Sequence, residues 1–273
     1  MKSNLNQPRR FRAGFTLVEL LTVIAIIAIL AAMLLPVLAA AKKRAQKVQA
    51  GLQERDIVTA IEKYDSDYGR FPVSAAAQAA ANGNSSDFTY GGTFQLSDGT
   101  ASQIGTTVPS LGSVMTNSEV IAILMDLTNY PTGGLTVNTN YQKNPRQIAY
   151  LNAKMSGDDS SPGVGTDLVY RDPWGNPYVI SMDLNYDEQC LDAYYGLRCV
   201  SQPQANTTAG YGGLINAVDA SGNGNNFQYH GKVMVWSAGP DKKIETFSKT
   251  TYPPTGGNAN SGMNKDNVVS WIQ

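Results

Sequence analysis

The sequence is poor in the residues on which most catalytic and metal sites depend. Its 273 residues include two cysteines and a single histidine, His230, too few of the usual ligands for a tetrahedral zinc site. It contains no P-loop, no G-x-S-x-G elbow, no H-E-x-x-H pair and no dinucleotide-binding glycine fingerprint. Because no catalytic motif is present, we predict that the chain is not an enzyme.

Charge is also scarce, at 16% of residues, and the net charge is −1. The first fourteen residues hold four of the 21 basic side chains and none of the 22 acidic ones. The remainder therefore carries 17 basic against 22 acidic groups, about −5. The sequence has no basic patch of the kind that would indicate nucleic-acid binding. The many Gly, Asn, Ser and Thr residues suit a loop-rich domain outside the cytoplasm.

One long apolar run, Phe15 to Ala41, has only three polar side chains, Thr16, Glu19 and Thr22. As a helix, its 27 residues extend roughly 40 Å, which exceeds the ~30 Å hydrocarbon core of a bilayer. Basic residues precede the run and no acid does. This predicts a membrane-spanning helix with a cytoplasmic N-terminus and the rest of the chain on the far side.

Three interpretations of this run are open. A secretory signal peptide would be cleaved after Ala39-Ala40-Ala41, but its apolar region is usually about 7–15 residues long. A plain uncleaved anchor does not account for Glu19, because an acid at mid-bilayer costs about 2.5–3.5 kcal/mol. The third interpretation, a processed leader, rests on the residues around Gly14.

The segment Gly14-Phe15-Thr16-Leu17-Val18-Glu19 resembles the prepilin processing site shared by type IV pilins and the pseudopilins of type II secretion. The resemblance implies that residues 1–14 are a leader, removed by a membrane peptidase that cuts after Gly14 and methylates Phe15. It also implies assembly roles for Glu19, the acid expected in this motif, and for Pro36, the helix-interrupting proline.

Residues 42–70 form a predicted amphipathic stem that continues the apolar helix to about Asp67. Its apolar side chains recur at three-to-five-residue steps, at Val48, Leu52, Ile57, Ile61, Tyr64 and Tyr68. Gly69 and Pro72 supply the stop signals. The sequence from Tyr64 to Pro72 also resembles the end of the pseudopilin helix.

Residues 71–273 are predicted to form a globular head. We expect a long connection over 74–114 with a short helix at 74–81, and a helix capped by Asn117. We expect strands after the turn at 172–178, over 232–237 and over 268–272, and an insertion over 201–229. Helices first and strands last indicate an α+β fold. With the resemblance, this is a type IV pilin-like fold: a long N-terminal helix packed on a small C-terminal antiparallel sheet.

A candidate cation site lies beside the last two strands, in Ser237–Asp241 and Asn264–Asn267. This region resembles the corresponding turns of major pseudopilins, which bind calcium in those turns. The Asp-Pro-Trp-Gly-Asn-Pro-Tyr turn at 172–178 also resembles a segment of major pseudopilins. The resemblance implies calcium ligands at Asp241, Glu245, Asp266, Asn267 and the backbone carbonyl of Ala238. Hard cations prefer such oxygen ligands. Alternatively, Lys242 or Lys243 neutralises the acids and no metal binds.

The two cysteines, Cys190 and Cys199, are separated by eight residues. Outside the cytoplasm such a pair most simply forms a disulfide that closes a small loop. Two free thiols and a metal site are the alternatives.

The leading hypothesis is a structural subunit of a type II secretion pseudopilus, in the inner membrane with a periplasmic head. Its implied partners are itself, other pseudopilins, the prepilin peptidase and the assembly platform of the secretion system. The first alternative is a type IV pilin for adhesion, motility or DNA uptake. The second is a membrane-anchored binding or enzymatic domain with a pilin-type leader, for which the long insertions leave room.

Overall fold

The computed structural model describes residues 16–84, 87–96, 98–203, 207–216, 224–245, 259 and 262–272. It divides into two compact units, Met1–Ala45 and Gln46–Gln273, and each is described by itself. The predicted boundary between the membrane helix and the stem, at residue 41, and the one between the stem and the head, at residue 70, remain predictions.

The helices are α1 Leu17–Tyr68, α2 Ala75–Asn84, α3 Ser118–Leu124 and α4 Arg198–Ser201, with 3-10 turns η1 Thr139–Tyr141, η2 Tyr211–Gly213 and η4 Gly262–Asp266. The strands are β1 Phe88–Tyr90, β2 Gly92–Leu96, β3 Ala101–Ile104, β4 Thr107–Val108, β5 Ser113–Val114, β6 Gly163–Val164, β7 Tyr170–Arg171, β8 Val179–Met182, β9 Gln189–Leu191, β10 Ile215–Asn216, β11 Phe227–His230, β12 Val233–Ser237, β13 Lys243–Ile244 and β14 Val268–Val269.

The long helix predicted from the sequence is confirmed: α1 is 52 residues long and continues through Pro36. It ends where the sequence predicts, because Gly69 takes a positive φ of 61° and its N–H bonds the carbonyl of Asp65 at 2.7 Å. A glycine in this left-handed conformation is a common helix stop.

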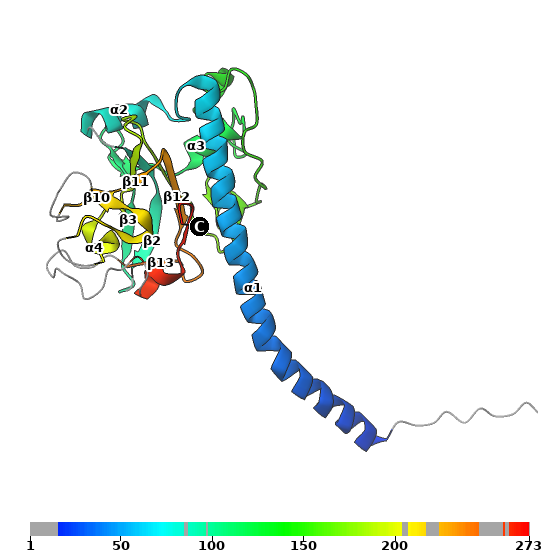
Figure 1. The fold of residues 1–273 in the computed structure, drawn as a ribbon. Helices are drawn as coiled ribbons and strands as arrows, with labels where there is room; N and C mark the ends of the chain where they lie inside the picture. The colour runs from blue at the N-terminus through cyan, green and yellow to red at the C-terminus, as the bar shows by residue number, and fades with distance from the viewer. Residues whose placement is uncertain are drawn as a thin grey trace, which may run out of the picture. The chain divides into compact units, whose positions relative to one another are not determined.

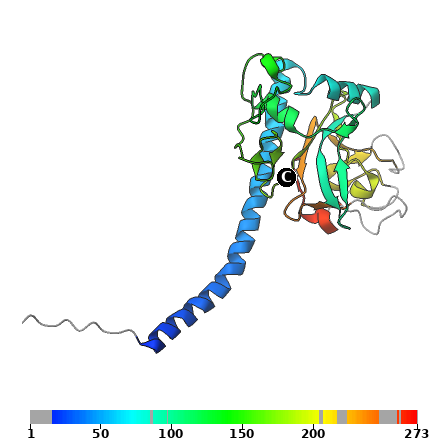
Figure 2. The ribbon, with the colours of Figure 1, turned by 180° about the vertical axis from the view of Figure 1, so that it is seen from behind.

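The main sheet has the order β1-β8-β12-β14, and each of its pairings is antiparallel. Smaller sheets have the orders β10-β11-β9 and β13-β2-β3 (Figure 1). With the long helix, this confirms the predicted α+β class. Figure 2 shows α3 beside the C-terminal part of α1.

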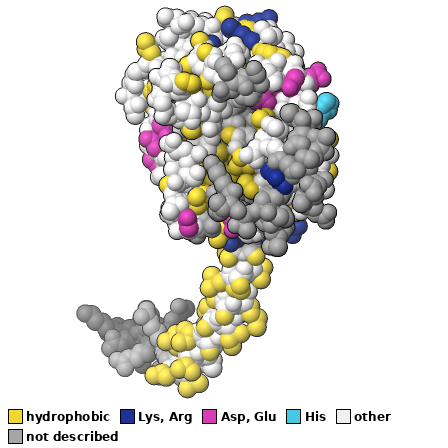
Figure 3. Space-filling model, turned by 90° about the vertical axis from the view of Figure 1, so that its left-hand side faces the viewer, with side chains coloured by type: hydrophobic (Ala, Val, Ile, Leu, Met, Phe, Trp, Pro, Cys, Tyr) yellow, Lys and Arg dark blue, Asp and Glu magenta, His cyan; other side chains and the backbone are white. Residues whose placement is uncertain are grey.

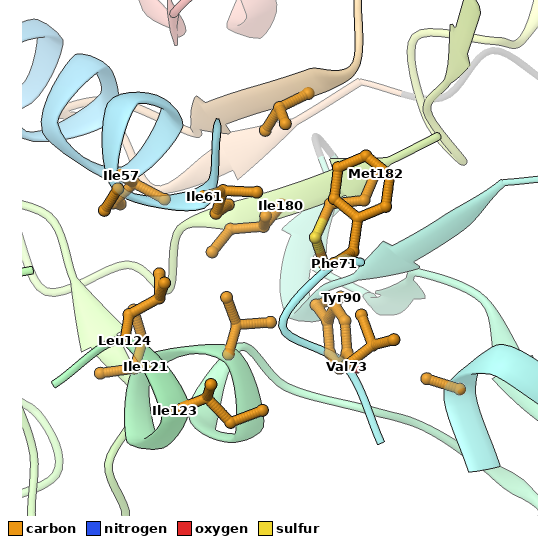
Figure 4. Close-up of a cluster of buried hydrophobic side chains, with 14 of the residues drawn as sticks. Ile57, Ile61, Phe71, Val73, Tyr90, Ile121, Ile123, Leu124, Ile180 and Met182 are labelled. Carbon is orange, nitrogen blue, oxygen red and sulfur yellow. The ribbon is translucent and has the colours of Figure 1, made fainter. Parts of the chain in front are cut away.

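The principal core lies between the stem part of α1, α3 and the main sheet. Ile57 and Ile61 of α1 meet Ile121 and Leu124 of α3 and Ile180 of β8, all fully buried (Figure 4). A second core surrounds Trp236 of β12, with Phe94, Tyr194 and Tyr195 against its ring.

The predicted stem stripe is wrong in its first half. Val48 is 60% exposed and Leu52 is 56% exposed, whereas Ala50 and Glu54 are fully buried. The buried positions on α1 are Ala50, Glu54, Ile57, Ala60, Ile61, Tyr64 and Asp65. Because 3.6 residues make one turn, positions 48 and 52 lie on the other side of the helix from 50 and 54.

Residues 74–114 contain more structure than the sequence predicts. The short helix is confirmed as α2, but five short strands, β1 to β5, follow it. β1 belongs to the main sheet, where Phe88 pairs with Met182. Within 201–229, η2, β10 and the start of β11 replace part of the predicted insertion.

Asn117 precedes α3 as predicted, but its side chain makes no capping bond. Its amide instead joins β7 to the residue before β8, since Nδ2 donates to the carbonyls of Tyr170 and Tyr178 and Oδ1 accepts from the N–H of Tyr170. The residue fixes the 170–178 turn against α3 rather than capping the start of the helix.

Candidate functional site

The N-terminus of α1 is closed by a reciprocal cap between Thr16 and Glu19. The Glu19 carboxylate accepts the N–H of Thr16 at 2.9 Å and its hydroxyl at 2.7 Å, and the N–H of Glu19 donates to Thr16 Oγ1. This is a capping box, which satisfies N–H groups that a helix start leaves without partners. Gly14 and Phe15, the predicted processing site, lie outside the described residues.

The face of the first part of α1 that Figure 3 shows is covered by apolar side chains. Its large hydrophobic side chains from Leu17 to Leu38 are 45–79% exposed. By length and composition, α1 could cross a membrane. Pro36 lies inside it and supplies no N–H to the helix ladder.

The predicted calcium ligands lie in two neighbouring turns of the head. Asp241 accepts the N–H of Lys243 at 2.9 Å. Burial, followed by the nearby charge of Asp241, raises the pKa of Asp266. The carbonyl of Asp266 faces Gly239, where an added Cβ would lie only 2.4 Å from that oxygen. Gly239, at φ +72°, therefore allows the two turns to approach.

The other three predicted ligands, Asn267, Glu245 and the carbonyl of Ala238, lie in different surroundings. Asn267 donates through Nδ2 to the hydroxyl of Tyr195, while its Oδ1 is buried without a hydrogen-bond partner. Glu245 turns its carboxylate to the N–H of Met263 at 3.3 Å. Ala238 is fully buried at the end of β12. In the part of the chain that the structure describes, no three His, Cys, Asp or Glu side chains are gathered closely enough to hold a metal.

The lysine alternative is not realised in the structure. Among the described residues, no ion pair joins Lys242 or Lys243 to Asp241, Glu245 or Asp266. It is the backbone N–H of Lys243 that bonds Asp241. The Oδ1 of Asn267 therefore keeps no hydrogen-bond partner, and the carboxylates of Asp241 and Asp266 have no ion-pair partner among the described residues.

The structure contains no disulfide between Cys190 and Cys199, so the disulfide prediction is corrected. Cys190 is a fully buried free thiol on β9, opposite Tyr229 of β11, and belongs to the core around Trp236. Cys199 lies on α4 and is half-buried. Burial raises the pKa of the Cys190 thiol well above its usual value, so the group behaves as a core side chain.

The buried network of Asp172 was not predicted. Its carboxylate accepts the N–H groups of Trp174 and Asn176, the side-chain amide of Asn176 and the hydroxyl of Ser237. Asn176 also donates to the carbonyl of Gly239 at 2.8 Å. The 172–178 turn is thus fastened to the turn that follows β12.

Glu54 is a second buried acid that sequence reasoning missed. It is fully buried on α1, and neither carboxylate oxygen has a hydrogen-bond partner. Burial, then the nearby Asp172, raises the pKa of Glu54 well above its usual value. Its position four residues after Ala50 and three before Ile57 is the signal that could have placed it in the core.

Comparison with known protein families finds a match in the N-terminal part of the chain. Residues 9–35 match the family described as "Prokaryotic N-terminal methylation motif". Over these residues the chain is similar to proteins that carry the prepilin-type methylation motif, as type IV pilins do. Pilin-type proteins assemble into filaments and are processed by a prepilin peptidase.

A particular relative is the "Type IV wide pilus major component PilA4" of Thermus thermophilus, 50% identical over 64 residues. The match covers 23% of this chain and 49% of the relative, so about half of that protein's length is matched. No solved structure matches the chain.

Proposed function

We propose that this chain is a structural subunit of a type II secretion pseudopilus, held in the membrane and later in a filament by α1. The supporting observation is the exposed apolar surface of α1, which has no covering partner among the described residues. The 172–178 turn, fastened to the turn after β12, favours a pseudopilin over other filament subunits because both segments resemble major pseudopilins.

The proposal includes an order of events. The prepilin peptidase cleaves after Gly14 and methylates Phe15, while the head lies in the periplasm and α1 spans the inner membrane. The assembly platform then moves subunits into a filament with copies of this chain and other pseudopilins. Glu19 neutralises the new amino group on Phe15 of a neighbour, an attraction much stronger in a low-dielectric core than in water. The role is structural, without catalysis.

Intact-mass measurement of the membrane-extracted protein tests this order. The expected mature chain begins at a methylated Phe15. A chain that begins at Lys42 identifies a secretory signal instead and overturns the proposal, and an uncleaved chain identifies a plain anchor. Expression in a strain without prepilin peptidase is the control, because the full leader should then be retained.

A type IV pilin is the second candidate, favoured by the similarity to a relative that is named a pilus component. Deletion of the gene separates the two. A pseudopilin deletion abolishes protein secretion and leaves surface pili in place, whereas a pilin deletion removes the pili and leaves secretion intact. Complementation with the wild-type chain is the control.

We also propose that the turns at Asp241 and Asp266 bind calcium. The fit is supported by the two neighbouring carboxylates and by the buried, unpartnered Oδ1 of Asn267. These groups and the carbonyl of Ala238 would hold the ion, which would tie the turn after β12 to the segment before β14. Glu245 contributes only if its carboxylate leaves the N–H of Met263.

Calcium stoichiometry of the full chain in detergent tests this second proposal. Asp241→Ala is expected to lower the number of bound ions by one per chain. Asp98→Ala, which removes an acid from an exposed turn, is the matched control. Unchanged stoichiometry in Asp241→Ala overturns the proposed site.

A further inference from the structure

A hollow of about 210 Å³ lies in the head beside the start of β1. Its lining residues come from positions 87–106, from the segment 191–197 that follows the pairing part of β9, and from position 225 just before β11. No Lys, Arg or His is among the described residues that line it. Any negative charge in its wall therefore has no counter-ion there.

The wall holds one buried carboxylate that lacks a full set of partners. Asp87 is 5% exposed, and its Oδ2 accepts the N–H of Leu191, whereas its Oδ1 has no hydrogen-bond partner. Burial raises the pKa of Asp87 to about 7, with smaller contributions from the charges of Asp183 and Asp187. A buried carboxylate oxygen without a partner is costly unless another group supplies the missing bond.

Two neutral oxygens line the same hollow. Thr106 Oγ1 accepts the N–H of Thr89 at 2.9 Å, and Asn225 Oδ1 accepts that of Arg198 at 3.0 Å. A hydroxyl oxygen and an amide oxygen each have two lone pairs, so each can accept one further bond. With Asp87, three acceptors from three separate segments therefore line one hollow.

The other side chains of the wall are largely apolar. Leu191, Ala193 and Leu197 line the hollow together with the three acceptors. Such a wall suits a methylene chain, which packs on apolar surface while its polar end makes hydrogen bonds.

The chemistry of the wall selects among ligands. An anion is repelled by Asp87. A calcium ion takes six to eight oxygens, usually with several carboxylates. The second acid of the wall, Asp192, already accepts four hydrogen bonds within the chain. A primary ammonium group carries one positive charge and three N–H donors, which matches one carboxylate and two neutral acceptors.

We propose that this hollow binds a primary alkylammonium group, with Asp87 as its counter-ion and Thr106 and Asn225 as further acceptors. The ammonium belongs to a small amine or to a lysine side chain of another protein. The site goes beyond the proposed pseudopilus role, and it does not depend on which secretion or pilus system the subunit serves.

The experiment titrates the full chain in detergent micelles with two probes, n-butylammonium and N-acetyl-lysine N-methylamide, followed by saturation-transfer NMR. Saturable binding of n-butylammonium alone assigns a small amine, and binding of the lysine derivative assigns a lysine side chain. Asp87→Asn keeps the shape of the side chain and is expected to weaken binding by about tenfold or more, because a charge-assisted hydrogen bond is lost. Ala193→Leu leaves Asp87 in place but fills the hollow, and it should also remove binding.

Asp56→Asn is the matched control, because it removes an exposed acid of α1 that lies outside the hollow, and it should bind as the wild type does. Tetramethylammonium has the same charge but no N–H group, so it should not displace the probes. The proposal is overturned if neither probe binds saturably, if tetramethylammonium competes as well as n-butylammonium, or if Asp87→Asn and Asp56→Asn bind equally well.

Discussion

Residues 17–45 and 46–68 belong to one helix, yet their apolar side chains are distributed in different ways. In the first part they surround the helix and are exposed, from Leu17 to Leu38. In the second part the stripe of Ile57, Ile61 and Tyr64 is fully buried against the head, whereas Val48 and Leu52 are exposed on the other side of the helix. Both parts are helical, so the arrangement of apolar residues, and not the secondary structure, indicates what covers each part. The stripe is covered by the chain's own head, and the all-round surface requires lipid or other helices.

The two acids on α1 sharpen this comparison. Glu19 lies at the helix start and is held by Thr16, whereas Glu54 lies inside the stripe with both oxygens unpaired. One acid is proposed to act when subunits meet, and the other affects the chain's own folding. The four predictions below test these two parts of α1, from the largest expected effect to the smallest.

Glu19→Leu should abolish filament incorporation and leave membrane insertion intact, because the proposed partner for the amino group of Phe15 is lost. Shear fractions that separate filaments from membranes provide the measurement. Thr22→Val, which changes a polar side chain one turn further on, is the control and should assemble normally. Normal assembly of Glu19→Leu would disprove the neutralising role.

Ile61→Ala should destabilise the head by about 2–5 kcal/mol, the usual cost of emptying a core position. Ile27→Ala removes the same atoms from a side chain that is 58% exposed, and it should leave the unfolding of the head unchanged. Chemical denaturation in detergent, monitored by tryptophan fluorescence, measures both. Equal effects would contradict the division of α1 into two parts.

Glu54→Met should stabilise the head by about 1–3 kcal/mol at neutral pH, because a buried carboxyl without partners is replaced by an apolar side chain. The pKa of Glu54 is raised on folding, so its protonated form suits the folded state. The head should thus be most stable below the ordinary pKa of a glutamate and lose stability as the pH rises toward the folded-state pKa.

The gain from Glu54→Met should accordingly increase with pH, which denaturation at several pH values measures. Glu62→Gln, at an exposed position on the same helix, is the control and should show no such trend. A gain that does not change between acidic and neutral pH would contradict an uncharged Glu54.

Leu52→Ser should change the stability of the head by less than about 0.5 kcal/mol, the range of most surface substitutions. Leu52 is 56% exposed, although its spacing in the sequence suggests a core position. The same denaturation assay is sufficient. A loss comparable to that of Ile61→Ala would show that Leu52 is covered in the assembled state of the sample.

The sequence was sufficient to predict the long helix, its end at Gly69, the strands after 178 and over 233–237, and the α+β class. These elements have strong periodic or turn signals. The strand β1 escaped prediction because Phe88-Thr89-Tyr90 is short and its pairing with β8 is distant in the chain. The stripe was misplaced because Ala50 and Glu54 carry little apolar signal, while the exposed Val48 and Leu52 carry much.

The residues of the candidate sites could likewise be predicted only where a local motif marks them. Asp241 and Asp266 stand in two recognisable turns, and the charge of Asp241 contributes to the raised pKa of Asp266, while calcium binding there stays a prediction. The disulfide failed because spacing alone does not tell that Cys190 points into the core around Trp236.

The order of the main sheet has a consequence for biosynthesis. β8 needs β1 on one side and β12 on the other, and β14 joins last, so its pairings link residues as distant as Phe88 and Met182 or Trp236 and Val269. Such long-range pairing is slow and must wait until the later strands have left the ribosome. The apolar start of α1 emerges long before that, so targeting machinery can bind it while the head is still unfolded.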